Sequence, residues 1–144
     1  MANAHEGRDR VALLLKRALE GDASTIDQLR GVSQPALMAA ADRLGGTLTF
    51  GRPTVLKVLI DWRDGRVTEA QVRSWAFLMF SGALPEAEQR RSPSDGMPQP
   101  IDVNYSDDEV VNDIVFELKD LGEIVDGIVT PSERNAMIRL LEGS

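Results

Sequence analysis

The sequence feature that most constrains the fold is the segment of residues 69–81, which is apolar on nearly all sides of a predicted helix. Thr68 precedes this segment and predicts a helix cap. Its apolar residues are Val72, Trp75, Ala76, Phe77, Leu78, Met79 and Phe80. A helix without a polar stripe is usually buried at the centre of a protein. Other elements must therefore cover this helix on several sides.

Amphipathic segments that could provide this cover lie on both sides of it in the sequence. Their apolar residues recur at helical spacing, and capping residues or glycines mark their ends. The predicted helices span residues 8–20, 25–30, 34–44, 53–62, 69–81, 107–121 and a last segment that begins at Pro131. Residues 47–50 and 100–105 are predicted to be extended. The chain of 144 residues is long enough for one hydrophobic core, so we expect an all-α, single-domain bundle of five to six helices over residues 1–144.

Several helix starts carry cap signatures, and one long segment carries none. Ser33 is predicted to cap the helix that follows it, and the pairs Ser106–Glu109 and Thr130–Glu133 have the spacing of capping boxes. Residues 82–100 are rich in proline and polar residues and lack helical periodicity. This composition predicts a long mobile loop within the domain.

Composition excludes several classes of function. The chain has no cysteine and a single histidine, His5, so thiol chemistry, cysteine–zinc sites and triads with an internal histidine are not expected. No cofactor signature is present either, and we do not expect an enzyme. The acidic pI of about 4.7 argues against direct binding to nucleic acid. No apolar run approaches the roughly 20 residues of a membrane span, and the polar N-terminus does not resemble a signal peptide.

Acidic residues are concentrated in residues 102–126. This segment holds nine acids against one base, Lys119, and its net charge of −8 slightly exceeds the −7 of the whole chain. The rest of the sequence is therefore close to neutral. A charge field gathered on one short element predicts a surface that meets a basic partner.

Helical periodicity divides the predicted helix at 107–121 into two faces. The core face is formed by Val110, Val111, Ile114, Val115, Leu118 and Leu121, and acids lie on the other side around Phe116. An aromatic side chain among carboxylates is typical of a binding hot spot. The predicted partner-binding residues are Asp108, Glu109, Asp113, Phe116, Glu117, Asp120 and Glu123. The alternative interpretation is an ordinary solvated face, with Phe116 covered by the loop at 82–100.

Other candidate sites are weaker. Asp126-Gly127 followed by Glu133 does not fit a calcium loop, because Gly122 and Ile124 would occupy ligand positions. Clustered carboxylates could hold magnesium or act as an acid/base pair, but no sequence feature marks a substrate pocket. Trp62 and Trp75 lie on apolar helices and are expected in the core.

Two stretches carry a resemblance to a known class of proteins. These are VLIDWRDGRVTEAQVRSWA at residues 58–76 and YSDDEVVNDIVFEL at residues 105–118. Their layout resembles small acidic helical immunity proteins, which bacteria use against their own toxins, over roughly residues 55–142. The resemblance implies a cytoplasmic inhibitor whose acidic helix face covers the basic active-site cleft of a toxin.

These observations predict a non-enzymatic inhibitor that binds a basic protein, plausibly a nuclease-type toxin, through the acidic helix face. Nuclease clefts are positively charged because they hold phosphates, so an acidic surface can occupy them. The alternative is a regulatory or scaffolding module that acts through an apolar groove or through self-association. Neither function involves direct contact with nucleic acid or with a membrane.

Overall fold

The computed structural model of the chain describes residues 4–30, 32–45, 47–81, 102–105, 108–121 and 129–142. The predicted mobile loop at 82–100 lies outside these residues. The described elements are α1 (Ala4–Leu19), the 3-10 helix η1 (Ala23–Thr25), α2 (Ile26–Leu29), α3 (Gln34–Arg43), β1 (Thr47–Phe50), α4 (Arg52–Arg63), α5 (Glu69–Ser81), β2 (Asp102–Tyr105), α7 (Glu109–Leu118) and α8 (Pro131–Glu142).

The fold is all-α in class, and the described part of the chain contains seven α-helices. The predicted number of five to six helices is therefore too low. Each of the seven predicted spans, including the short one at residues 25–30, corresponds to one of these helices, and the shortest is α2, a single turn that directly continues η1. Such a short helix has almost no periodic pattern of its own, and it is stabilised here by the buried side chains of Ile26 and Leu29.

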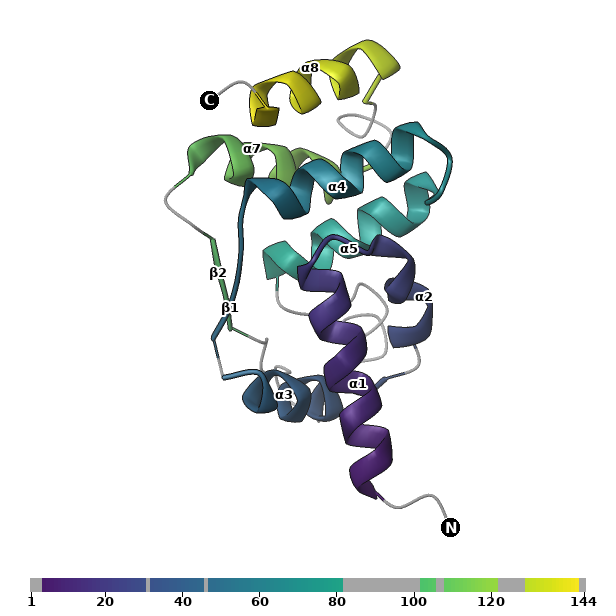
Figure 1. The fold of residues 1–144 in the computed structure, drawn as a ribbon, viewed down its shortest axis with the longest axis vertical. Helices are drawn as coiled ribbons and strands as arrows, with labels where there is room; N and C mark the ends of the chain where they lie inside the picture. The colour runs from purple at the N-terminus through teal and green to yellow at the C-terminus, as the bar shows by residue number, and fades with distance from the viewer. Residues whose placement is uncertain are drawn as a thin grey trace, which may run out of the picture.

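Helix α5 lies at the centre of the molecule, as its apolar sequence predicts. It contacts α2, η1, α4, α7 and β2, and it separates a group formed by α1, α2 and α3 from a group formed by α4, α7 and α8 (Figure 1). The side chains of Val72, Trp75, Ala76, Leu78 and Met79 are fully buried. Burial of this helix on several sides joins the two groups into one hydrophobic core.

The two predicted extended segments pair with one another, which the sequence pattern alone does not reveal. Strands β1 and β2 are parallel, with Thr47 opposite Asp102 and Phe50 opposite Tyr105. Parallel strands need a long crossover connection, and part of it is formed here by α4 and α5. Because β1 leads into α4 and β2 precedes α7, the strand pair brings the starts of these helices to one side of the molecule (Figure 1).

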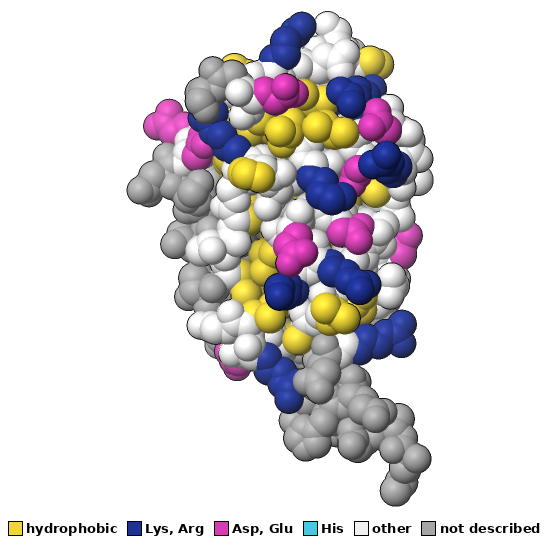
Figure 2. Space-filling view, viewed as in Figure 1, with side chains coloured by type: hydrophobic (Ala, Val, Ile, Leu, Met, Phe, Trp, Pro, Cys, Tyr) yellow, Lys and Arg dark blue, Asp and Glu magenta, His cyan; other side chains and the backbone are white. Residues whose placement is uncertain are grey.

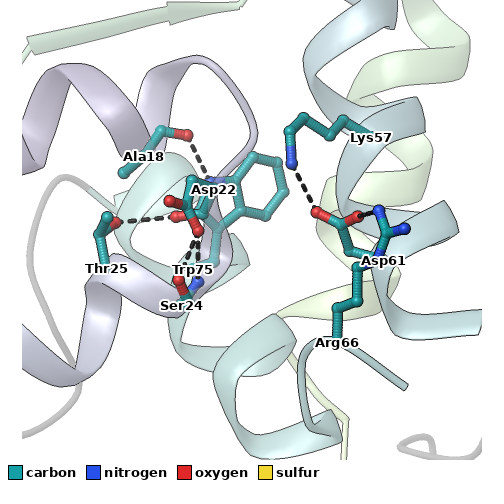
Figure 3. A network of polar contacts seen from close by, with 8 residues as sticks. All are labelled: Ala18, Asp22, Ser24, Thr25, Lys57, Asp61, Arg66 and Trp75. Carbon is teal, nitrogen blue, oxygen red and sulfur yellow. Dashed lines mark hydrogen bonds and ion pairs between the residues drawn. The ribbon is translucent and has the colours of Figure 1, made fainter. Parts of the chain in front are cut away.

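The end of α1 is held against α4 and α5 by polar contacts. The indole Nε1 of Trp75 donates to the carbonyl oxygen of Ala18 at 2.8 Å (Figure 3). The hydroxyl of Thr54 donates to the carbonyl oxygen of Leu19 at 2.8 Å. Asp22 then caps η1, since its carboxylate accepts from the backbone N–H of Ser24. Carbonyls left free at a helix end are thus satisfied by side chains from other elements.

The turn between α4 and α5 is organised around Asp61, a buried carboxylate (Figure 3). Lys57 Nζ lies 2.6 Å from one carboxylate oxygen, and Arg66 Nη1 lies 3.4 Å from the other. The backbone N–H of Arg66 also donates to the Asp61 carbonyl at 2.8 Å. Both charge and backbone of Asp61 therefore fix the path of the chain from α4 into α5.

Most of the predicted caps are confirmed. The hydroxyl of Ser33 accepts from the N–H of Ala36 at 3.3 Å, and that of Thr130 accepts from the N–H of Glu133 at 3.1 Å. Thr68 forms a reciprocal capping box with Gln71. These bonds set the first residues of α3, α5 and α8.

Candidate protein-binding surface on helix α7

Helix α7 begins two residues later than the sequence pattern predicts, and a different residue caps it. The predicted N-cap, Ser106, lies outside the described residues, and the structure assigns the N-cap to Asp108 instead, whose carboxylate accepts from the N–H of Val110 at 3.1 Å. Aspartate is as good an N-cap as serine. A long-range ion pair with Arg52 also holds Asp108 in place.

Arg52 fastens the start of α7 to two other helices. This residue is the first of α4, and its Nε and Nη2 atoms both donate to the carboxylate of Asp108, the latter at 3.1 Å. Its Nη1 donates to the carbonyl oxygen of Leu140 near the end of α8 at 3.3 Å. The hydrogen bonds with Arg52 hold the pKa of the Asp108 carboxyl below its usual range. Asp108 thus forms contacts within the chain.

The inner face of α7 is the one that periodicity predicts. Val111, Ile114, Val115 and Leu118 are buried, as is Leu121 just beyond the helix, and Val110 packs at the edge of the core. This face contacts α5, α4 and α8. Its burial fixes which residues of α7 point outward.

The outer face carries a row of exposed acids, Glu109, Asp113 and Glu117, which we call the acid row. These residues are four apart and so lie one above the other on the helix. Among the described residues, none of the three forms an ion pair or a side-chain hydrogen bond. Each carboxylate therefore remains available to a partner.

Acids elsewhere are often paired within the chain. Asp27 lies 3.5 Å from Arg30, and Asp64 lies 3.1 Å from Arg63. On the face shown in Figure 2, Lys and Arg side chains alternate with Asp and Glu side chains over much of the surface. The acid row, by contrast, has three like charges in succession on one helix.

Phe116 lies beside the acid row and is 52% exposed. Its ring makes an edge-to-face contact with Phe80, the next-to-last residue of α5, with ring centroids 5.6 Å apart at an interplanar angle of 68°. Phe80 is itself 43% exposed, which departs from the prediction that α5 is buried all round. The contact adds an aromatic partner from a second helix to the predicted surface.

Lys119 covers this aromatic pair from one side. Its Nζ lies 4.2 Å from the ring centroid of Phe116 and 5.0 Å from that of Phe80. The same ammonium donates to both carboxylate oxygens of Asp120, each at 3.0 Å. Asp120, a predicted partner-binding residue, is therefore already bound to a cation. Glu123, the last predicted residue, lies outside the described part of the chain.

Sequence reasoning missed three residues of this region: Arg52, Phe80 and Lys119. Lys119 lies three positions after Phe116, which is a spacing at which helical side chains meet, so the sequence did contain a signal for this contact. Arg52 and Phe80 are 56 and 36 positions away from their partners Asp108 and Phe116. No local pattern reports such contacts.

The two tryptophans differ in how far they are buried. Trp75 is fully buried, as predicted. Trp62 is only half-buried, and the guanidinium of Arg134 from α8 lies 5.0 Å from its ring centroid. This contact helps to fasten α8 to α4.

The described residues contain neither a metal site nor a membrane-spanning helix. In this part of the chain, no group of three or more Asp, Glu or His side chains is placed so that it could hold a metal ion. Among the same residues, no helix has the length and apolar character needed to span a membrane.

Comparisons with protein-family models, with curated proteins and with solved structures gave no match.

Proposed function

We propose that this protein is a non-enzymatic inhibitor that binds a basic protein through the acid row and Phe116. The partner would be a nuclease-type toxin, and the chain would serve as its immunity protein. The observation that carries the proposal is the position of an exposed aromatic ring next to three exposed carboxylates without partners among the described residues.

The negative charge of the acid row supports a basic partner. Carboxylates in a row repel one another and would be relieved by cations from outside. Such a field also accelerates the encounter with a basic protein. A toxin that cleaves nucleic acid needs a positive cleft for phosphates, and an acidic helix can occupy that cleft in place of the substrate.

The aromatic ring supports a stable complex rather than a loose encounter. Hot spots of interfaces are enriched in large side chains that become fully buried on binding, with polar groups around them. Phe116 fits this description, since half of its surface is available and its ring is held in place by Phe80 and Lys119. Asp113 and Glu117 flank it on the helix.

The test compares three baits in a capture experiment from the lysate of the source organism. These are the wild-type chain, a variant with Glu109→Lys, Asp113→Lys and Glu117→Lys, and a matched control with Glu20→Lys, Asp42→Lys and Glu142→Lys. Both variants change the net charge by the same amount, but the control places its lysines at exposed positions outside α7. We expect wild type and control to capture the same basic protein and the α7 variant to lose it.

The captured protein is then produced alone, and its cleavage of RNA and DNA is measured with increasing amounts of the chain. We expect complete inhibition at one equivalent. Equal capture by all three baits, or a captured protein without nuclease activity that the chain suppresses, would contradict the proposal. Circular dichroism of each bait establishes that the substitutions leave the helices intact.

The alternative function, scaffolding through an apolar groove or self-association, has less support. The exposed large apolar residues in the described part of the chain are Leu13, Phe80, Phe116 and Leu140. The two leucines belong to α1 and α8, helices that lie on opposite sides of α5 (Figure 1). Salt separates the two functions, because charge-steered binding weakens as ionic strength rises and binding in an apolar groove does not.

A further inference from the structure

Phe80, Phe116 and Asp120 together surround a cation. The ammonium of Lys119 lies over both rings and contacts both oxygens of the carboxylate. Aromatic faces attract cations through their quadrupole, and the carboxylate adds a full negative charge. The arrangement therefore has the chemistry of a cation site, which the chain fills with its own side chain.

The internal cation, Lys119, comes from the acidic segment itself. Lys119 is the single basic residue among residues 102–126, and its side chain is only 15% exposed. A lysine elsewhere in this segment could have paired with the acid row, but Lys119 contacts the rings and Asp120 instead. In the free protein it neutralises Asp120 at the edge of the surface, and the acid row has no ion pair among the residues that the structure describes.

From this geometry we infer that the site formed by Phe80, Phe116 and Asp120 receives an arginine side chain of the partner, and that Lys119 is its internal competitor. The inference rests on the proposed function, since it names the group of the basic partner that binds next to the acid row. On binding, the partner's guanidinium takes the place of the Lys119 ammonium, which moves out into solvent.

Arginine suits the site better than lysine. A guanidinium is planar, so it stacks on an aromatic ring while its N–H groups bind a carboxylate in two places. It is also less strongly hydrated than an ammonium and loses less on leaving water. Phe116 offers a half-exposed ring, and Asp120 offers both carboxylate oxygens.

The test uses a defined probe rather than the natural partner. The probe is an acetylated and amidated octapeptide of four Arg-Gly repeats, and two matched peptides carry lysine or citrulline in place of arginine. Binding is followed by NMR through the ring protons of Phe80 and Phe116 and the side-chain protons of Lys119. We expect the arginine peptide to shift both rings and to give Lys119 the shifts of a free lysine, and the citrulline peptide to do neither.

Two substitutions give the decisive comparison. Lys119→Gln removes the competitor, whereas Arg139→Gln removes an exposed cation from α8 and changes the net charge equally. We expect Lys119→Gln to tighten binding of the arginine peptide several-fold more than Arg139→Gln does. Phe116→Leu keeps an apolar side chain but removes the π-face, and it should weaken binding by about two- to fivefold.

Equal affinities of Lys119→Gln and Arg139→Gln for the arginine peptide would overturn the inference, as would ring shifts of the same size with the citrulline peptide. These failures are distinct from failure of the proposed function. If reversal of the acid row abolishes capture of a basic protein while Lys119→Gln behaves as Arg139→Gln does, the proposed function stands and the arginine site is rejected. If the arginine peptide displaces Lys119 but no basic protein is captured, the site stands without that function.

Discussion

At the scale of single residues, Gly21 shows how closely α1 and α4 approach. Its φ is +100°, and a Cβ atom at this position would lie 2.7 Å from the backbone oxygen of Thr54. Gly65 also has a positive φ, of +78°, but has no described atom within 4 Å of such a Cβ. Both glycines thus provide the left-handed conformation, and only Gly21 also provides space.

Alanine substitutions separate these two roles. Gly65→Ala should lower the free energy of unfolding by about 1 kcal/mol, which is the cost of the left-handed conformation. Gly21→Ala should lower it by about 1–3 kcal/mol more, because backbone must also move. Urea unfolding of the two variants gives both values. Equal losses would mean that α1 and α4 separate easily and that the joint is not tightly packed.

A second prediction concerns the buried carboxylate of Asp61, which lies in the turn between α4 and α5. Asp61→Asn removes the charge that binds Lys57 and Arg66 and should cost about 1–3 kcal/mol in the free energy of unfolding. Asp64→Asn is the matched control, since Asp64 pairs with Arg63 at the exposed surface, where such pairs contribute at most about 1 kcal/mol. A loss for Asp61→Asn no larger than that for Asp64→Asn would show that burial of the Asp61 carboxylate adds nothing to the strength of its ion pairs with the exposed Lys57 and Arg66.

At the scale of elements, the ion pair of Arg52 and Asp108 ties α7 to α4, and it should respond to pH. Binding lowers the pKa of Asp108, so its stabilisation is fully present above the ordinary aspartate pKa of about 3.9. The stabilisation is lost as pH falls through the lower pKa of the folded protein. Asp108→Asn keeps a good N-cap and removes only the charge.

We therefore expect wild type to be more stable than Asp108→Asn at pH 6, with a difference that shrinks as pH falls below about 4. Urea unfolding at a series of pH values measures this difference. Arg52→Gln is the companion variant and should lose the same pH-dependent contribution. A difference that stays constant down to pH 2 would show that the charge of Asp108 does not stabilise the junction.

The elements also show what local sequence can predict. Apolar periodicity and caps such as Thr68 predict the helices, because both depend on residues within about one turn. The pairing of β1 with β2 joins residues more than 50 positions apart, and the ion pair that holds the α7 cap joins Asp108 to the distant Arg52. Strand pairing and long-range ion pairs depend on tertiary contacts, so a local sequence pattern does not predict them.

At the scale of the whole molecule, the same distinction applies to the candidate surface. The exposure of the acid row follows from the buried face of α7, so periodicity predicts it. The role of Lys119 does not follow, because it depends on Phe80 of another helix. Sequence reasoning thus identifies where charge gathers, whereas the structure shows which charges are already bound within the chain.

Repulsion within the acid row should lower the stability of the entire protein. Like charges four residues apart on a helix destabilise it by about 0.2–0.5 kcal/mol per pair, and the row contains two such pairs. The variant Asp113→Asn with Glu117→Gln should therefore be more stable than wild type, by about 1–3 °C in Tm. Its Tm should also rise less with added NaCl, because wild type alone has this repulsion to screen.

Asp42→Asn with Glu142→Gln changes the net charge equally at exposed positions on α3 and α8, and it separates the effect of the row from that of overall charge. Thermal unfolding at low and high NaCl measures all three proteins. If only the variant with Asp113→Asn and Glu117→Gln gains in Tm, and if it also loses the captured basic protein, the acid row lowers stability in favour of binding, as is common at functional surfaces. A fall in Tm for the α7 variant would instead show that these acids stabilise the fold, and a surface needed for the fold itself gives no reason to expect a partner.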